Sequence, residues 1–519
     1  MVVNTTTSLV TFSILSPDAS LSYDRIKLRL KEYRTLLASD SDTIELATEN
    51  GKTVICRKQA NEMGAYLDQA ERLLRDVVQS RNISTLVVLH SLRNLAEVLD
   101  NLQLYDECRL TGNCALGLAE ALGRRSLDFR QEQAETFALI AGLTVYRPRA
   151  RTLFIRAVSI CEEEVANNAS HSNKHGLLIV LYRAGSWASD HLCAQWLERA
   201  VQLMTKELPP TMVHPEFRGV IYYNYGYVLE ELKQHSNALK AYHEAISIRR
   251  TLVNNHSAKS NLYLAETFTN MGVALCHLGK YDDSIDAYKE ALGICTTMSA
   301  QDPLQYNEQM ATTLLDYGVV LERANRVSEA AVVKKKAVSL YRDLARAGND
   351  RTGLLCDALH NYGHSCNLLG RHEEAVLVYQ ESIRLRRALV AANPVEEEYL
   401  IAALHFIANS FHALGKHADA IAAANEALER NHWRVNEDCD YAPDFKACFV
   451  CRRGTILDSL HNVSPPLPFI RAVFTPWRAG TGASLTPTET PDRTGESTST
   501  PGHRKWDTLL GLFRGNRGW

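Results

Sequence analysis

The sequence contains a pattern that recurs every 45 or 46 residues between about Gly219 and Leu428. Each copy has a glycine, a leucine or alanine six residues later, and small residues twelve and nineteen positions after the glycine. A period of this length is typical of a solenoid, in which each unit packs only against its neighbours. The glycine position is alanine in the last copy, and the five residues are Gly226, Gly272, Gly318, Gly363 and Ala408.

Each copy is predicted to form two helices, because its apolar residues recur at intervals of three and four. A glycine on the first helix and a small residue on the second allow the two helices to pack closely. Three copies have an aromatic residue between the two small positions, where we expect it to fill the space between successive repeats. These aromatic residues are Tyr242, Tyr288 and Tyr379.

This pattern resembles the tetratricopeptide repeat (TPR) family, which has a Leu-Gly pair, an aromatic residue and alanines at similar spacings. The common TPR unit has about 34 residues, and the additional residues here follow the second helix. The copies are therefore similar to the long repeats of kinesin light chains and of fungal and bacterial signalling proteins. In the latter, an Arg-Arg-x-Leu…Asn-Pro segment closes a repeat, as at Arg386 to Pro394. HEAT and armadillo repeats have a similar period, but the register of glycine and alanine argues against them.

The resemblance implies an all-α fold, a right-handed TPR superhelix (α-solenoid) of about eight helix-turn-helix repeats followed by a disordered C-terminal tail. The array is expected over residues 86–430, with regular repeats in 215–430 and divergent repeats before them. Residues 1–20 are predicted to be a disordered N-terminus and 21–85 a helical N-terminal cap. Residues 431–478 form a C-terminal extension, with helical tendency from Asp444 to Leu460. Residues 479–519, rich in Gly, Thr, Ser and Pro, are predicted to be disordered and to end in a short amphipathic segment.

The composition excludes several classes of partner. The 519 residues carry a net charge of −3, which gives no reason to expect nucleic acid or an anionic membrane as partner. No apolar stretch is long enough to span a bilayer, and the N-terminus lacks the basic start of a signal peptide. The twelve cysteines are scattered without a disulfide framework, so we expect reduced thiols and a cytoplasmic location.

No motif predicts catalysis or a cofactor. The phosphate-binding pattern Gly-x-x-x-x-Gly-Lys-Ser/Thr is missing from the sequence, and no Ser/His/Asp or Cys/His set lies in a strand-turn-helix context. Cys448-x-x-Cys451, with Cys439 and His432, has zinc-like spacing but lacks a second close pair. We therefore predict no metal, while a metalloprotein or enzyme that uses residues 431–478 stays an alternative.

The resemblance also implies that partner proteins bind the concave surface lined by the first helices. Asn and His side chains on this surface can hydrogen-bond the backbone of an extended peptide. The alternatives are solvated polar residues on a helix face, or a metal held by four of the histidines, His360, His364, His405 and His412. The candidate partner-binding residues are Tyr223, Asn224, Tyr227, Asn270, His360, Asn361, His364, His405, Asn409 and His412.

These observations predict a non-catalytic scaffold or adaptor that binds a partner peptide or helix in the concave groove. In an alternative hypothesis the protein regulates itself, because the tail segment from Trp506 to Phe513 is apolar and on a flexible tether, which raises its local concentration. That segment would then occupy the groove and compete with partners. The sequence names neither the partner, nor the pathway, nor the oligomeric state.

Overall fold

The computed structural model describes residues 85–438 apart from gaps at 103, 127–128, 145, 254–257, 347–350 and 392–395. It also describes residues 43–48, 51–56, 64–73 and parts of 26–35. The chain divides into two compact units: Met1–Gln234 with Thr475–Trp519, and His235–Phe474. The expected disordered tail and the cysteines at 439, 448 and 451 lie outside the described residues.

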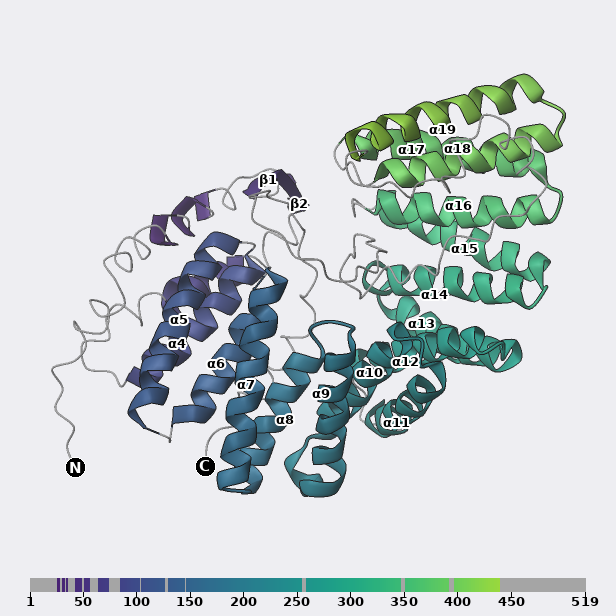
Figure 1. The fold of residues 1–519 in the computed structure, drawn as a ribbon. Coiled ribbons are helices and arrows are strands. Elements are labelled where there is room, and N and C mark those ends of the chain that lie inside the picture. Colours follow the sequence, from purple (N-terminus) through teal and green to yellow (C-terminus); the bar gives the residue numbers. More distant parts are fainter. Residues whose placement is uncertain are drawn as a thin grey trace. The chain divides into compact units, whose positions relative to one another are not determined.

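Unit 1 contains a series of helical hairpins (Figure 1). Within each hairpin the two helices pack against one another, and α7 also packs against the following α8. After α9 the chain passes through a π-helical turn, Leu203–Glu207, and a 3-10 turn, Pro210–Met212. The helices are α4 (Thr85–Asn101), α5 (Tyr105–Arg125), α6 (Arg130–Gly142), α7 (Arg147–Asn167), α8 (His171–Gly185), α9 (His191–Gln202) and α10 (Pro215–Glu231).

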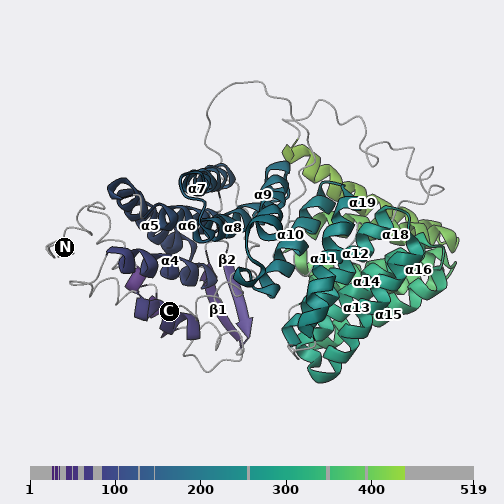
Figure 2. The ribbon, with the colours of Figure 1, turned by 90° about the horizontal axis from the view of Figure 1, so that it is seen from below.

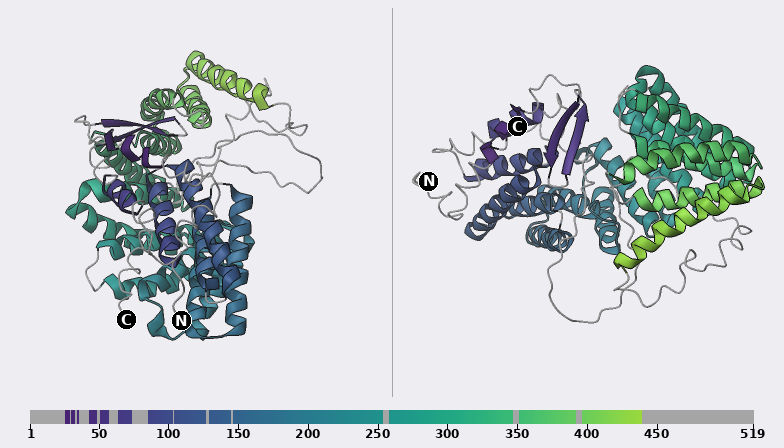
Figure 3. Two further views of the ribbon diagram at one scale, coloured as in Figure 1. Left: turned by 90° about the vertical axis from the view of Figure 1, so that its left-hand side faces the viewer. Right: turned by 90° about the horizontal axis from the view of Figure 1, so that it is seen from above.

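A β-hairpin lies within the segment 21–85, for which the sequence predicts a helical cap. Strands β1 (Thr43–Thr48) and β2 (Gly51–Cys56) pair antiparallel, with Thr48 opposite Gly51 (Figure 3). The prediction of helix is therefore wrong for residues 43–56. The physical reason is the local sequence, since both strands are rich in β-branched residues and a two-residue connection closes a hairpin.

Unit 2 is a stack of hairpins that follows α11 (His235–Val253). Each second helix from α13 to α17 packs against the first helix of its own repeat and against the first helix of the next repeat. Figure 2 shows α12, α14, α16 and α18 following one another through this unit. The hairpins are α12 (Ala258–His277) with α13 (Tyr281–Gln301), α14 (Pro303–Arg323) with α15 (Val327–Arg346), α16 (Thr352–Leu368) with α17 (His372–Val390), and α18 (Glu396–Ala413) with α19 (His417–Asp438).

Among the described residues, α4 to α19 are sixteen helices in chain order, the number that eight helix-turn-helix repeats require. Seven hairpins pack within a unit, while α10 is the last helix of unit 1 and α11 is the first helix of unit 2. The prediction of an all-α solenoid of about eight repeats is therefore confirmed, with the hairpin of β1 and β2 as the one exception among the described residues.

The turn inside each regular repeat has one residue with positive φ at a fixed position. Gly279, Gly370 and Gly415 have φ of 73°, 71° and 72°, and Lys233 and Asn325 have φ of 62° and 61°. The left-handed conformation lets the chain reverse direction directly after the first helix. Glycine adopts it without steric penalty, whereas lysine and asparagine have a side chain that disfavours it.

The glycine of the first helix lies against a side chain of the second helix in the same repeat. A Cβ atom added at Gly363 would be 2.7 Å from Cζ of Tyr379, and one added at Gly272 would be 2.6 Å from Cε2 of Tyr288. The small residue also helps, because the hydroxyl of Ser284 donates a hydrogen bond to the Gly272 carbonyl at 2.6 Å. The ring therefore packs over the glycine within its own repeat.

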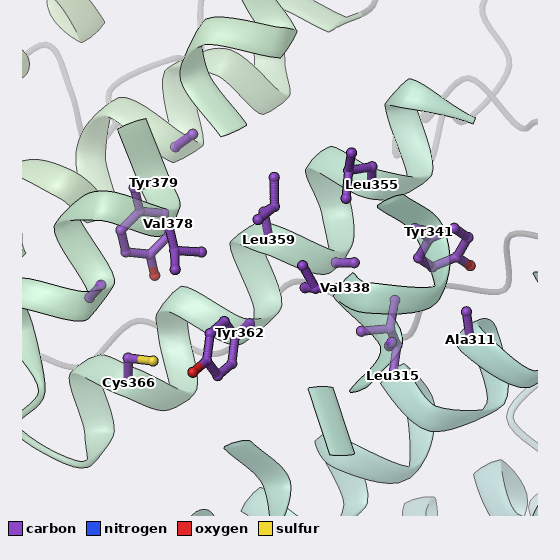
Figure 4. Packing of buried hydrophobic residues seen from close by; sticks show 14 of the residues in the cluster. Ala311, Leu315, Val338, Tyr341, Leu355, Leu359, Tyr362, Cys366, Val378 and Tyr379 are labelled. Atoms are coloured by element: carbon purple, nitrogen blue, oxygen red, sulfur yellow. The ribbon is translucent and has the colours of Figure 1, made fainter. Parts of the chain in front are cut away.

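The same rings also contact the next repeat, as the sequence predicted. Tyr288 stacks on Tyr317 of α14 with ring centroids 5.9 Å apart, and Tyr379 stacks on Phe406 of α18 at 6.1 Å. Figure 4 shows buried residues of successive helices in unit 2 meeting in one apolar cluster that includes Tyr341 and Tyr379. The core is thus continuous from repeat to repeat.

Two arginines near the ends of second helices, Arg249 and Arg386, are buried. From the sequence alone, a positive charge near a helix C-terminus would account for both, because it is favourable there. Arg386 of α17 pairs with Asp357 of α16 and, at 2.7 Å, with Glu396 of α18. Arg249 of α11 donates hydrogen bonds to the Tyr263 carbonyl and the Thr267 hydroxyl of α12. Both arginines therefore connect successive repeats.

Replacing Gly363 with alanine should destabilise the protein by about 1–3 kcal/mol, since a new methyl group forces the Tyr379 ring from its place. Chemical denaturation followed by circular dichroism measures this effect. Gly293 of α13 is the matched control, because a Cβ there meets nothing within 4 Å. Its replacement with alanine should stabilise the helix by about 0.5–1 kcal/mol. Equal effects at both positions would contradict the proposed role of the glycine.

Candidate functional site

The structure separates the ten candidate residues by unit and by exposure. Tyr223, Asn224 and Tyr227 belong to unit 1, and the other seven belong to unit 2. The side chains of Tyr223, Asn224, His360, Asn361 and His364 are buried, whereas Tyr227, Asn270, His405, Asn409 and His412 are half-buried. The half-buried group is the part of this set that a partner can reach without a rearrangement of the helices.

Two of the buried amides have partners inside the protein. The side-chain nitrogen of Asn224 on α10 donates a hydrogen bond to Ser186, after α8, at 2.9 Å. The side-chain nitrogen of Asn361 donates to the Asp357 carbonyl of its own helix at 2.9 Å. These hydrogen bonds give Asn224 and Asn361 a structural role in packing.

A buried ion pair crosses the interior of unit 2 at the third regular repeat. Lys334 of α15 stands at the register position of Tyr288 and Tyr379, and its alkyl chain covers Gly318 as their rings cover Gly272 and Gly363. Its ammonium lies 2.7 Å from the carboxylate of Glu322 on α14, and both side chains are almost completely buried. The lysine therefore replaces the packing of an aromatic ring and brings a charge into the core.

Glu322 also reaches α16 of the following repeat. The Ser365 hydroxyl donates a hydrogen bond to its carboxylate, and the His364 ring nitrogen Nδ1 lies 3.5 Å from it. Burial alone raises the pKa of Glu322, but the contacts with His364, Lys334 and Ser365 outweigh burial and lower this pKa to about 2. The carboxylate therefore stays ionised and links two repeats.

His360 is enclosed by aromatic rings. Its imidazole makes edge contacts with Tyr379 of α17, at a centroid distance of 5.5 Å, and with Phe406 of α18, at 4.8 Å. Neither ring nitrogen has a hydrogen-bond partner among the described residues. Burial, reinforced by the positive charge of Arg386, lowers the pKa of His360 to about 3. The ring is therefore neutral and acts as a packing residue.

Three of the accessible candidate residues of unit 2 lie on one face of α18. His405, Asn409 and His412 are spaced by four and three residues, so they lie on the same side of the helix. The Asn409 amide is 3.5 Å from the His405 ring, and its side-chain oxygen accepts no hydrogen bond within the described residues. We call these three residues the α18 polar face.

The α18 polar face is held in place by the repeat before it. Ser410 of α18 is completely buried and donates a hydrogen bond to the side-chain oxygen of Asn367 on α16 at 2.9 Å. Burial lowers the pKa of His405, so its ring is neutral at neutral pH. A rigid row of imidazole and amide groups can both donate and accept hydrogen bonds, which suits the backbone of a peptide.

Sequence reasoning missed the polar pairs that join one first helix to the next. In unit 1, the buried Arg93 of α4 contacts Glu132 and Glu135 of α6 at 2.9 and 3.1 Å. In unit 2, Glu322 of α14, which pairs with Lys334 of α15, contacts Ser365 and His364 of α16 in the same way. A lysine at an aromatic position of the repeat is the one sequence signal that could have indicated the second pair.

The described part of the chain lacks both a metal-ligand cluster and a membrane-spanning helix. No three His, Cys, Asp or Glu side chains in it come together as metal ligands. None of its helices combines the length and the apolar composition needed to cross a bilayer. The alternative zinc set at residues 432–451 lies outside these residues, apart from the backbone of His432.

Lys334→Met should destabilise the protein by about 3–5 kcal/mol, because it leaves the Glu322 carboxylate buried beside an uncharged side chain. Denaturant unfolding gives the free energy of each variant. The double variant Lys334→Met with Glu322→Gln should recover most of this loss, because no unpaired charge then remains. A double variant as unstable as the single one would show that the packing of the lysine, and not its charge, is what matters.

The stability of the protein should decrease as the pH falls from 6.5 towards 5. The folded state holds His360 neutral with a pKa of about 3, while the unfolded chain takes up a proton near the ordinary histidine pKa of 6.5. Stability is therefore unaffected by this group above pH 6.5 and falls below it by up to about 1.4 kcal/mol per pH unit. Glu322 adds nothing to this decrease above pH 4.5.

Unfolding of a His360→Leu variant between pH 6.5 and 5 checks this expectation. The variant should show a shallower decrease than the unaltered protein, with a remainder due to His277 and His405, whose pKa values burial also lowers. His243 of α11 is exposed and serves as control, since His243→Gln should leave the decrease unchanged. An equally steep decrease in the His360 variant would refute the assignment.

Comparison with known proteins gives two matches to family models. Both models are described as tetratricopeptide repeat, and they match residues 217–297 and 357–389. The first match runs from α10 to α13, and the second covers α16 and α17. No curated protein sequence matches the chain.

Several solved structures resemble the chain in part. TPR-like repeats of a putative kinesin light chain from Podosopora anserina are 16% identical, with a TM-score of 0.34, over 44% of this chain and 99% of that one. A signal transduction ATPase with a tetratricopeptide repeat sensor from Pyrococcus horikoshii is 13% identical, with a TM-score of 0.42, over 85% and 67% of the two chains. The apo form of RapI is 10% identical, with a TM-score of 0.44, over 68% and 99%.

Proposed function

Because the chain is a tetratricopeptide-repeat protein, we propose that it is a non-catalytic scaffold or adaptor that binds a segment of another protein. The observation that supports this proposal most is the α18 polar face, on which His405, Asn409 and His412 stay half-exposed. Many other polar side chains of the first helices in unit 2 are buried, among them Thr312, Asn361 and His364.

The chemistry of the α18 polar face favours an extended peptide as ligand. The imidazoles of His405 and His412 and the amide nitrogen of Asn409 can hydrogen-bond the backbone of a peptide, whereas the side-chain oxygen of Asn409 is buried. The face carries no formal charge when its histidines are neutral, so recognition depends on hydrogen bonds and shape. Together with the net charge of −3, this favours a protein partner over nucleic acid.

We place this activity in the cytoplasm. Eight cysteines between Cys108 and Cys366 are free thiols, seven of them buried, as in proteins of reducing compartments. The alternative occupant of the groove, the tail from Trp506 to Phe513, lies outside the described residues, and so does most of the C-terminal extension.

Selection of random peptides displayed on phage against the purified full-length protein tests the proposal. The triple variant His405→Ala, Asn409→Ala, His412→Ala should bind the selected peptides at least about tenfold more weakly, since each hydrogen bond contributes about 0.5–1.5 kcal/mol. Its helicity should not change, because these side chains are not part of the buried core.

The matched control lies on the outer surface of α17, where Glu373, Gln380 and Arg384 are exposed. Replacing these three residues with alanine should leave peptide affinity unaltered. The proposal is wrong if no peptide is enriched over an unrelated protein, or if both triple variants bind with the affinity of the unaltered chain.

A further inference from the structure

The far face of α19 has no partner among the described residues. From α13 to α17, every second helix in unit 2 packs on its outer side against the first helix of the following repeat. Helix α19 is the last described helix, and its substantial contacts are with α18 alone. Figure 1 shows α19 at the outer edge of the stack within this unit.

The residues on this face are those that the earlier repeats bury. On α17, Val376 and Ile383 are 7% and 6% exposed. The residues at the same register of α19, 45 positions later, are Ile421, which is 53% exposed, and Leu428, which is half-buried. The residues that match Ile421 on α13 and α15 are also buried, namely Ile285 and Ala331. This face of α19 therefore has the apolar residues that contact a following first helix in the earlier repeats, and no described helix covers it.

The sequence that follows α19 keeps the spacing of the earlier copies for one more half-repeat. Gly454 stands 46 residues after Ala408, and Leu460 stands 46 residues after Leu414, which is the spacing of the earlier copies. Phe445, Phe449, Ile456 and Leu460 are separated by four, seven and four residues, so in a helix they share one face.

The length of the connection also fits. Helix α19 ends at Asp438, and five residues separate it from Asp444. Five residues also separate α15 from α16 and α17 from α18. After Leu460 the sequence has prolines at 465, 466 and 468, a composition that disfavours a long second helix. The segment 444–460 thus has the features of a first helix without its second helix.

We propose that residues 444–460 form a ninth first helix that packs on the far face of α19 and closes this end of the solenoid. A terminal unit in a repeat protein needs one apolar side towards the stack and one polar side towards water. Ile421 and Leu428 provide the surface on α19, and Phe449 and Ile456 provide the apolar side of the segment. This inference concerns the end of the stack and is independent of the proposed peptide binding.

Hydrogen exchange of the full-length protein, followed by mass spectrometry, tests this inference. In the unaltered chain, amides of 444–460 should exchange at least about tenfold more slowly than in the same segment as a free peptide. Ile421→Asp should remove this protection while exchange in α12 to α16 stays unchanged. Leu377→Asp is the control, because Leu377 is 68% exposed on α17 and lies outside the uncovered face.

A second variant covers the possibility that Ile421→Asp unfolds α19 itself. Phe449→Asp leaves α19 intact and should both release 444–460 and increase exchange in α19, which would lose its cover. The inference is overturned if 444–460 exchanges like a free peptide in the unaltered chain, or if its protection survives both substitutions. If the unaltered chain dimerises, Ile421→Asp abolishes the dimer and 444–460 is not protected, the face of α19 binds a second copy of the chain instead. Protection confined to 506–513 would assign it to the tail.

Discussion

The packing of one side chain over one glycine sets the distance between the two helices of a regular repeat in unit 2. At Gly272, Gly318 and Gly363 the covering atoms belong to the residue four positions after the small residue of the second helix. A larger residue at the glycine would push the helices apart and displace the ring that also contacts the next repeat. Spacing within one repeat and contact between repeats therefore depend on the same atoms.

In the third regular repeat, a charged side chain covers the glycine in place of an aromatic ring. Lys334 fills the place of an aromatic ring, and burying its ammonium group is favourable only because Glu322 lies 2.7 Å away. Because Glu322 also contacts Ser365 and His364 of the next repeat, the ion pair joins two hairpins as well as two helices. Buried pairs of this kind add little net stability, but they restrict how neighbouring helices can be placed.

Much of the fold could be predicted because its determinants are local. The spacing of Gly226 and its counterparts identifies every hairpin of the regular repeats, since turn, glycine and small residue all lie within one repeat. The hairpin of β1 and β2 was missed because no repeat pattern extends to residues 43–56. The candidate site was harder to predict, since burial of His360 depends on Phe406 from the following repeat. A register position on a first helix cannot tell such a buried residue from an accessible one such as Asn409.

The hydrogen bond from Ser410 to Asn367 joins α18 to the hairpin before it, so ligand binding on α18 affects how readily this hairpin opens. In a linear stack each hairpin is held only by its neighbours, so the terminal hairpin opens more readily than the middle ones. A ligand on α18 binds the closed form alone and so prolongs its lifetime. A bound ligand should therefore slow the opening of the hairpin of α18 and α19, while distant hairpins keep their own opening rates.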